Sequence, residues 1–258
     1  MRSAALQQLA ALLQTKKLDR TVPRAWEHEG GVAPTGIASL DTALGGGWRQ
    51  GEVSEIVGRR STGRTSLLVA TLAAATARGE LAGLVDPFDQ FDPVTAAAAG
   101  LELERVLWVR GTALIGGAGA SGAARSVRAS PFARARLIDD AVSRGVRALD
   151  LIVRAGGFGV AALDLIGVPA RVVRALPFTT WMRLAHANEG QQTVCLLTAE
   201  APVGRSARGA SLELEATCRW TGSSRQARRC AGFDIRARIV QARMGADSEP
   251  SWVLRAVC

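Results

Sequence analysis

A glycine-rich loop between a strand-like run and a helix-like run limits this chain to few architectures. Residues 58–65 read GRRSTGRT, which matches the phosphate-loop pattern GxxxxGK[ST] at every fixed position except the lysine, where Arg64 stands. A strand is expected before the loop at 51–57, and a helix rich in leucine and alanine after it at 65–78. At such a helix N-terminus, backbone N–H groups and the helix dipole attract phosphate. The order strand, loop, helix predicts one unit of a parallel sheet.

Further along the chain, predicted strands alternate with predicted helices, as in parallel βαβ units. Strands are expected at 81–85, 106–109, 159–166 and 193–198, and helices at 133–154 and 180–187. From residue 211 on, apolar and polar residues alternate, which predicts antiparallel strands at one edge of the sheet. The predicted fold class is therefore α/β, with a mostly parallel sheet flanked by helices and antiparallel strands at the C-terminus.

Three segments are predicted. Residues 1–30 form an amphipathic N-terminal helix and a linker, residues 31–210 form the α/β core, and residues 211–258 form the antiparallel strands that complete the same domain. The N-terminal helix could pack on its own domain or dock on a neighbouring subunit or another partner, so self-association stays open.

The charge balance favours an acidic partner. The chain has 32 Lys and Arg against 23 Asp and Glu, a net charge of +9, which favours phosphate backbones or acidic protein surfaces. Composition drift explains the preference for arginine over lysine but not the surplus of base over acid. No stretch reaches the roughly 18–20 uncharged residues of a membrane span, and no signal-peptide cleavage pattern is present, so a cytoplasmic protein is expected.

The cysteines and histidines predict no zinc site. The four cysteines form no CxxC pair, and the two histidines lie far apart in the sequence. Reduced thiols are the expectation. Cys218 and Cys230 could face each other across a hairpin, although nothing in the sequence requires it.

The loop predicts a nucleotide site with altered chemistry. The candidate nucleotide-binding residues are Gly58, Ser61, Gly63, Arg64, Thr65 and Asp164. Asp164 ends an apolar strand, as expected of an aspartate that reaches a metal, or it caps the next loop. Thr65 and Asp164 would hold a metal only with a magnesium nucleotide, so ATP with Mg²⁺ is the one candidate cofactor. Arginine is longer and planar where lysine is a compact point charge, so binding could survive but efficient hydrolysis is not expected.

Three segments resemble the opening of the RecA core. They are residues 34–47 (PTGIASLDTALGGG), the loop 58–65, and residues 85–93 (VDPFDQFDP). The resemblance covers residues 34–110 well and persists from 133 to 258 as the order of elements. It implies a RecA-like fold of the P-loop NTPase class.

The positions at which this chain departs from RecA are ones that RecA uses for ATP hydrolysis. The glutamate that orients the attacking water in RecA aligns with Phe88, and Asp89 beside it would point elsewhere on an extended chain. The polar Asn-Gln pair of RecA aligns with Thr198 and Ala199. With Arg64, three hydrolysis elements are changed together, which implies a degenerate site.

Basic loops supply candidate DNA contacts. In a RecA-like fold the loops after the Asp164 strand and after the following strand face DNA. The candidate DNA-binding residues in these loops are Arg171, Arg174, Arg205 and Arg208. Arginines among small residues can clamp phosphates. A solvated basic surface, or docking of an acidic protein, is the alternative.

This chain resembles the ImuA family of RecA-like proteins. The resemblance rests on the degenerate site, the amphipathic N-terminal helix and the C-terminal hairpin 236–254. The family's genes lie beside those of ImuB and an error-prone DnaE-type polymerase. The resemblance implies an accessory role in damage-induced (SOS) mutagenic translesion synthesis, through contact with ImuB, the DnaE-type polymerase, RecA or single-stranded DNA. Two alternatives stay open, namely a DNA-stimulated ATPase that uses Arg64 and Asp164, and a cell-division inhibitor of the SulA type.

Overall fold

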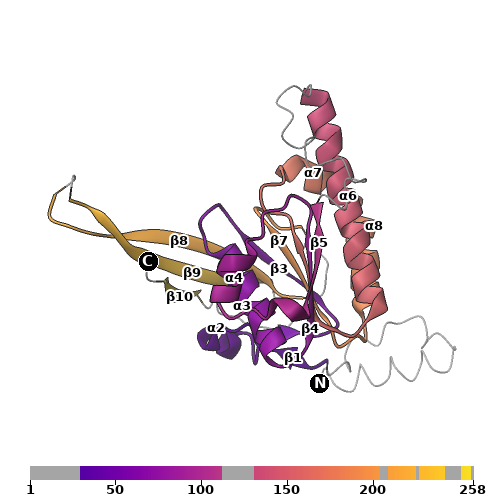
Figure 1. Ribbon diagram of the computed structural model, residues 1–258, viewed down its shortest axis with the longest axis horizontal. Helices are drawn as coiled ribbons and strands as arrows, with labels where there is room; N and C mark the ends of the chain where they lie inside the picture. The colour runs from indigo at the N-terminus through magenta and orange to yellow at the C-terminus, as the bar shows by residue number, and fades with distance from the viewer. Residues whose placement is uncertain (1–29, 112–130, 204–208, 225–226, 242–250, 257–258) are drawn as a thin grey trace, which may run out of the picture. The chain divides into compact units, whose positions relative to one another are not determined.

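The computed structural model describes residues 30–111, 131–203, 209–224, 227–241 and 251–256. Within residues 31–258, the main sheet has eight strands in the order β10-β9-β8-β3-β7-β6-β4-β5 (Figure 1). The strands are β3 (Val53–Gly58), β4 (Leu81–Asp86), β5 (Val106–Arg110), β6 (Phe158–Asp164), β7 (Val194–Ala199), β8 (Ser211–Thr221), β9 (Arg229–Gln241) and β10 (Ser251–Ala256).

The sheet is mostly parallel. Neighbours from β8 through β3, β7, β6 and β4 to β5 all pair in parallel, whereas β8 with β9 and β9 with β10 pair antiparallel. The α/β class and the antiparallel C-terminal strands are thus confirmed. One detail differs from the prediction, because β8 joins β3 in parallel, and the antiparallel pairings are those of β9 with β8 and with β10.

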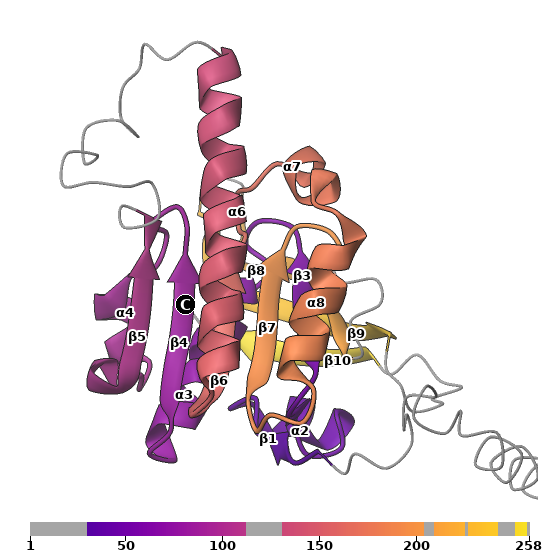
Figure 2. The same cartoon turned by 90° about the vertical axis from the view of Figure 1, so that its right-hand side faces the viewer.

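Helices cover both faces of the sheet (Figure 2). One face carries α3 (Arg64–Ala77) and α4 (Pro93–Ala98), and the other carries α6 (Pro131–Ala155), α7 (Ala170–Ala175) and α8 (Phe178–Asn188). The central strands are buried on both sides, which explains the apolar runs of β6 and β7. In the described residues, no helix combines the length and the apolar character that crossing a membrane requires.

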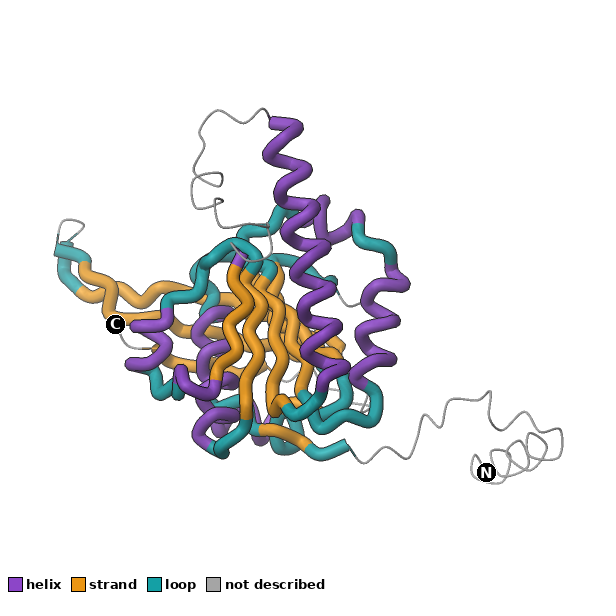
Figure 3. Tube along the Cα trace, turned by 45° about the vertical axis from the view of Figure 1, so that its right-hand side comes forward, coloured by secondary structure: helices purple, strands orange, loops and turns teal. Residues whose placement is uncertain are grey.

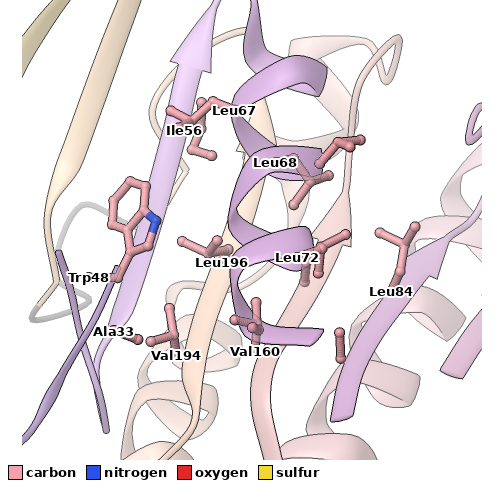
Figure 4. Packing of buried hydrophobic residues seen from close by; sticks show 14 of the residues in the cluster. Ala33, Trp48, Ile56, Leu67, Leu68, Leu72, Leu84, Val160, Val194 and Leu196 are labelled. Carbon is pink, nitrogen blue, oxygen red and sulfur yellow. The ribbon is translucent and has the colours of Figure 1, made fainter. Parts of the chain in front are cut away.

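Trp48 packs the first described elements of the domain, residues 32–49, against α3. The strands β1 (Val32–Ala33) and β2 (Trp48–Arg49) form a small antiparallel sheet, with α2 (Ala38–Ala43) between them in sequence. The Trp48 side chain is fully buried, and its indole N–H donates to Thr71 Oγ1 at 3.1 Å. Figure 4 shows it next to Ile56 of β3 and Leu196 of β7, in the same core cluster as the leucines of α3. The run 34–47 is thereby connected to the helix of the phosphate loop.

The sequence did not predict helix α7. Its six residues follow Pro169 and are too few for a periodic pattern. The predicted N-terminal helix lies outside the described residues.

Candidate nucleotide site

The parallel strands bring the predicted site residues together at the carboxyl ends of the central strands. Asp164 pairs with Thr198, and Ile56, near the end of β3, also pairs with Thr198. The carboxyl ends of β3, β6 and β7 are therefore adjacent, and ligands of open α/β sheets bind at such ends. The phosphate loop begins at these carboxyl ends, between β3 and α3. Figure 3 shows loops joining strands to helices at both ends of the sheet.

The phosphate loop has the backbone that its sequence requires. Ser61 has φ 59° and Gly63, the residue before α3, has φ 88°, both in the left-handed region. Thr62 Oγ1 donates to the Arg59 carbonyl at 2.8 Å and fixes the turn. A Cβ at Gly58 would lie 2.5 Å from the Leu214 carbonyl oxygen, so only glycine fits there beside β8. Thr65 and Ser61 are exposed, where a ligand can reach them.

Arg64 turns inward from the first turn of α3. Its relative exposure is 3 %, and among the described residues its buried Nη1 has no hydrogen-bond partner. Burial lowers the pKa of Arg64, while the charges of Glu200 and Asp164 oppose that shift. A buried guanidinium N–H without an acceptor is costly, and an anion would satisfy it. The residues present therefore fit a phosphate group, held by the loop amides and Arg64.

Asp164 is buried and engaged within the protein. Its Oδ1 accepts hydrogen bonds from Thr198 Oγ1 at 2.6 Å and from the Ile166 backbone N–H at 2.9 Å. Burial is the main cause that raises the pKa of Asp164, and the two hydrogen bonds and Arg64 act against it. Asp164 thus caps the following loop, which is one of its two expected roles, and its charge also acts on Arg64. Thr198, at the aligned sensor position, points its hydroxyl at this carboxylate.

The acid-rich segment after β4 offers no carboxylate at position 88. Phe88 is partly buried and packs against the core cluster beneath α6. The Asp89 carboxylate accepts from the Gly111 N–H at 3.1 Å and pairs with Arg110 at the end of β5. Asp86 is buried and accepts from the N–H groups of Gln90 and Phe91. These acids hold the turn and the neighbouring strand end.

Glu200 belongs to the site and was not predicted. It follows β7 directly and is exposed, and of the charges that raise the pKa of Arg64 it has the largest effect. The signal available in the sequence was an acid immediately after a buried strand. Glu200 and Arg174 also line a small hollow between the ends of β6 and β7, together with Leu165 and Ala199.

The structure places two of the four candidate DNA-binding residues. Arg171 and Arg174 lie on α7, after β6, and both are exposed. Arg205 and Arg208 lie outside the described residues. The described residues on either side of them are 200–203, which follow β7, and the start of β8, where Ser211 pairs with Glu55 of β3.

Glu55 fastens both sides of that connection. Its Oε2 accepts from the Val203 N–H at 2.8 Å and its Oε1 from Ser211 Oγ at 2.7 Å, in a buried setting. Glu55→Ala is expected to lower the free energy of unfolding by about 2–4 kcal/mol, since two hydrogen bonds to a buried acceptor are removed and their donors lose their partner. Urea unfolding measures this, with Glu80→Ala at an exposed ion pair as the control. Equal, small losses for both variants would contradict the anchoring role.

Comparison with known proteins agrees with the geometry over part of the chain. Residues 14–112 match the family model of the RecA N-terminal domain. RecA of Prochlorococcus marinus (strain MIT 9303) is 43% identical over 74 residues, which are 29% of this chain and 20% of the relative. RecA of Synechococcus sp. (strain CC9605) is 44% identical over 73 residues, 28% of this chain and 20% of the relative. The match thus spans about a fifth of the length of these relatives. The chain is therefore similar to RecA in the segment that carries the phosphate loop, and its α/β fold is RecA-like.

Proposed function

We propose that this chain is a RecA-like accessory factor in damage-induced mutagenic translesion synthesis that does not hydrolyse ATP efficiently. The observation that supports this most is the site itself. Arg64 replaces the phosphate-loop lysine and is buried, and Phe88 stands where a water-orienting carboxylate is expected. Phosphoryl transfer depends on placement of charge and water, so this combination favours binding over turnover.

The partners in this proposal follow from the resemblance to the ImuA family and from the charge. ImuB, the error-prone DnaE-type polymerase and RecA are the proposed protein partners, and single-stranded DNA is the proposed nucleic acid. A net charge of +9 supports contact with phosphates. The proposed location is the cytoplasm. If ATP with Mg²⁺ binds, the loop amides and Arg64 would hold the phosphates, and Thr65 and Asp164 are the proposed metal ligands.

A complementation assay tests the accessory role. In a host strain that lacks this chain, damage-induced mutagenesis is expected to return with the wild type and also with Asp164→Asn. The reason is that the role proposed here does not need turnover. Loss of mutagenesis in Asp164→Asn, at wild-type protein levels, would favour the DNA-stimulated ATPase. Normal mutagenesis in the strain without the chain, with altered cell division, would favour the SulA-type function.

The exposed arginines of α7 are expected to contact DNA phosphates. Arg171→Ala with Arg174→Ala should weaken binding to single-stranded DNA and reduce the slope of log K against log salt by roughly 1–2, about 0.7 for each phosphate that is no longer neutralised. Fluorescence anisotropy across a salt series measures both quantities. The matched control is the double variant Arg78→Ala with Arg105→Ala, which removes two exposed arginines outside α7. An equal effect of the control would mean that α7 contributes to DNA binding only through the net charge of the protein.

A further inference from the structure

The outer part of the β8–β9 hairpin brings two cysteines together. Cys218 on β8 and Cys230 on β9 are 12 residues apart in sequence, and their Sγ atoms lie 3.2 Å apart. A disulfide bond measures about 2.05 Å, so the sulfurs are in contact and not bonded. Figure 1 shows β8 and β9 extending side by side toward the turn that joins them.

The strand register explains the contact. Trp220 pairs with Cys230, and side chains two apart on a strand share a face, so Cys218 and Cys230 are diagonal neighbours on one face. The register shifts at this point, because Arg219 pairs with Gly232 and Trp220 with Cys230. Residue 231 is the extra residue of a β-bulge, and a bulge bends and twists the strand locally. The bulge therefore lies between the two cysteines and shapes their approach.

The chemistry of this pair differs from that of the third described cysteine. Cys218 and Cys230 are half-buried, whereas Cys195 is fully buried in β7 and its pKa is raised to about 12. A thiol that stays protonated and inaccessible reacts slowly, so Cys195 is a built-in reference. In the described part of the chain, no group of three or more His, Cys, Asp or Glu has a metal-binding arrangement. Oxidation between the two sulfurs is therefore the reaction that the geometry favours over metal capture.

We propose that Cys218 and Cys230 are a dithiol–disulfide couple that exchanges with small disulfides such as oxidised glutathione. The thiolate of one cysteine attacks a sulfur of oxidised glutathione, and one glutathione leaves as a thiol. The second cysteine then attacks the mixed disulfide, the Cys218–Cys230 bond forms, and the second glutathione leaves. The two protons of the cysteine thiols end on the two glutathiones. Two thiols are oxidised and one disulfide is reduced.

The bond would close the hairpin around a basic, aromatic segment. Residues 219–229 lie between the cysteines and include Trp220, whose relative exposure is 58 %, and the exposed Arg228 and Arg229. A cross-link restricts the conformations open to the enclosed segment. The redox state thereby sets how tightly this segment is held. This inference concerns the hairpin and does not depend on the proposed role in translesion synthesis.

A redox titration of the full chain tests the proposal. The reduced protein is equilibrated with buffers of defined ratios of reduced to oxidised glutathione, acid-quenched, alkylated and digested with trypsin without reduction. Trypsin separates the partners into GASLELEATCR and CAGFDIR. The expected product is these two peptides joined within one chain, formed with loss of both thiols together and no retained glutathione, while Cys195 is alkylated only after unfolding. The hydrogen exchange of residues 219–221 should slow in the oxidised form.

Variants separate intramolecular exchange from general reactivity. Cys218→Ser and Cys230→Ser should each retain one glutathione on the remaining cysteine, because the resolving thiol is missing. Cys195→Ser should titrate like the wild type. Independent addition of two glutathiones to the wild type, a link only between chains, or a link to Cys258 in place of the pair would each overturn the proposal. The wild-type peptide map alone decides this if a variant is unstable.

Discussion

Replacement of Trp48 by alanine is expected to lower the free energy of unfolding by about 3–5 kcal/mol, the range for truncating a fully buried tryptophan. The indole fills the space between the first strands and α3, and its N–H donates to Thr71. The cost combines a large cavity with the removal of a hydrogen bond. Because α3 carries the phosphate loop at its other end, the loss is expected to extend to the site.

The matched control is Trp48→Phe. It keeps an aromatic ring in the cavity and removes the indole N–H, so a smaller loss of about 1–2 kcal/mol is expected. Guanidinium unfolding of both variants measures the difference. A loss below about 1 kcal/mol for Trp48→Ala would mean that Trp48 does not support the core as described.

The second large effect is expected at Thr198. Thr198→Val removes the hydroxyl that donates to the buried Asp164, while shape and volume stay nearly the same. Above the folded pKa of Asp164 the hydrogen bond that is removed is to a carboxylate, and a loss of about 1.5–3 kcal/mol is expected from a charge-assisted hydrogen bond. In an Asp164→Asn background the same change should cost less, about 1 kcal/mol. Equal losses of unfolding free energy in both backgrounds would contradict a hydrogen bond from Thr198 to a charged carboxylate.

The pH dependence of stability has a definite sign at Asp164. Burial raises its folded pKa above the unfolded value near 3.8. The stability that this shift contributes is fully present below the unfolded pKa and is lost as pH rises through the folded pKa. Asp164→Asn removes this titration and the cost of a buried charge. The variant is therefore expected to be more stable than the wild type above the folded pKa, with a flatter profile. Thermal unfolding across pH 3–8, roughly the range in which a shifted carboxyl titrates, measures it.

The fold was largely predictable because the sequence patterns that indicate it are local. The glycines of the loop, the continuous apolar strands and the alternation after residue 211 each reflect a structural need of the backbone. The parallel pairing of β8 with β3 was not predictable, since alternation shows which face a strand buries but not its neighbour.

The site was predictable in its residue types and less so in its contacts. The sequence indicated Arg64 and Asp164, but not that Thr198 would donate to Asp164 or that Glu200 would lie near Arg64. Those contacts depend on the order of β3, β7 and β6 in the sheet, which long-range packing decides. The pairing of Cys218 with Cys230 likewise depends on a bulge that no local pattern announces.

The phosphate site is expected to bind ATP without hydrolysing it efficiently. The most direct test is ATP hydrolysis by the purified chain, with and without single-stranded DNA, beside RecA as the positive control. We expect no turnover from the wild type, and none from Arg64→Lys, because Phe88 still supplies no carboxylate to orient water. DNA-stimulated turnover by the wild type that Asp164→Ala abolishes would contradict the account and would make this chain a working ATPase.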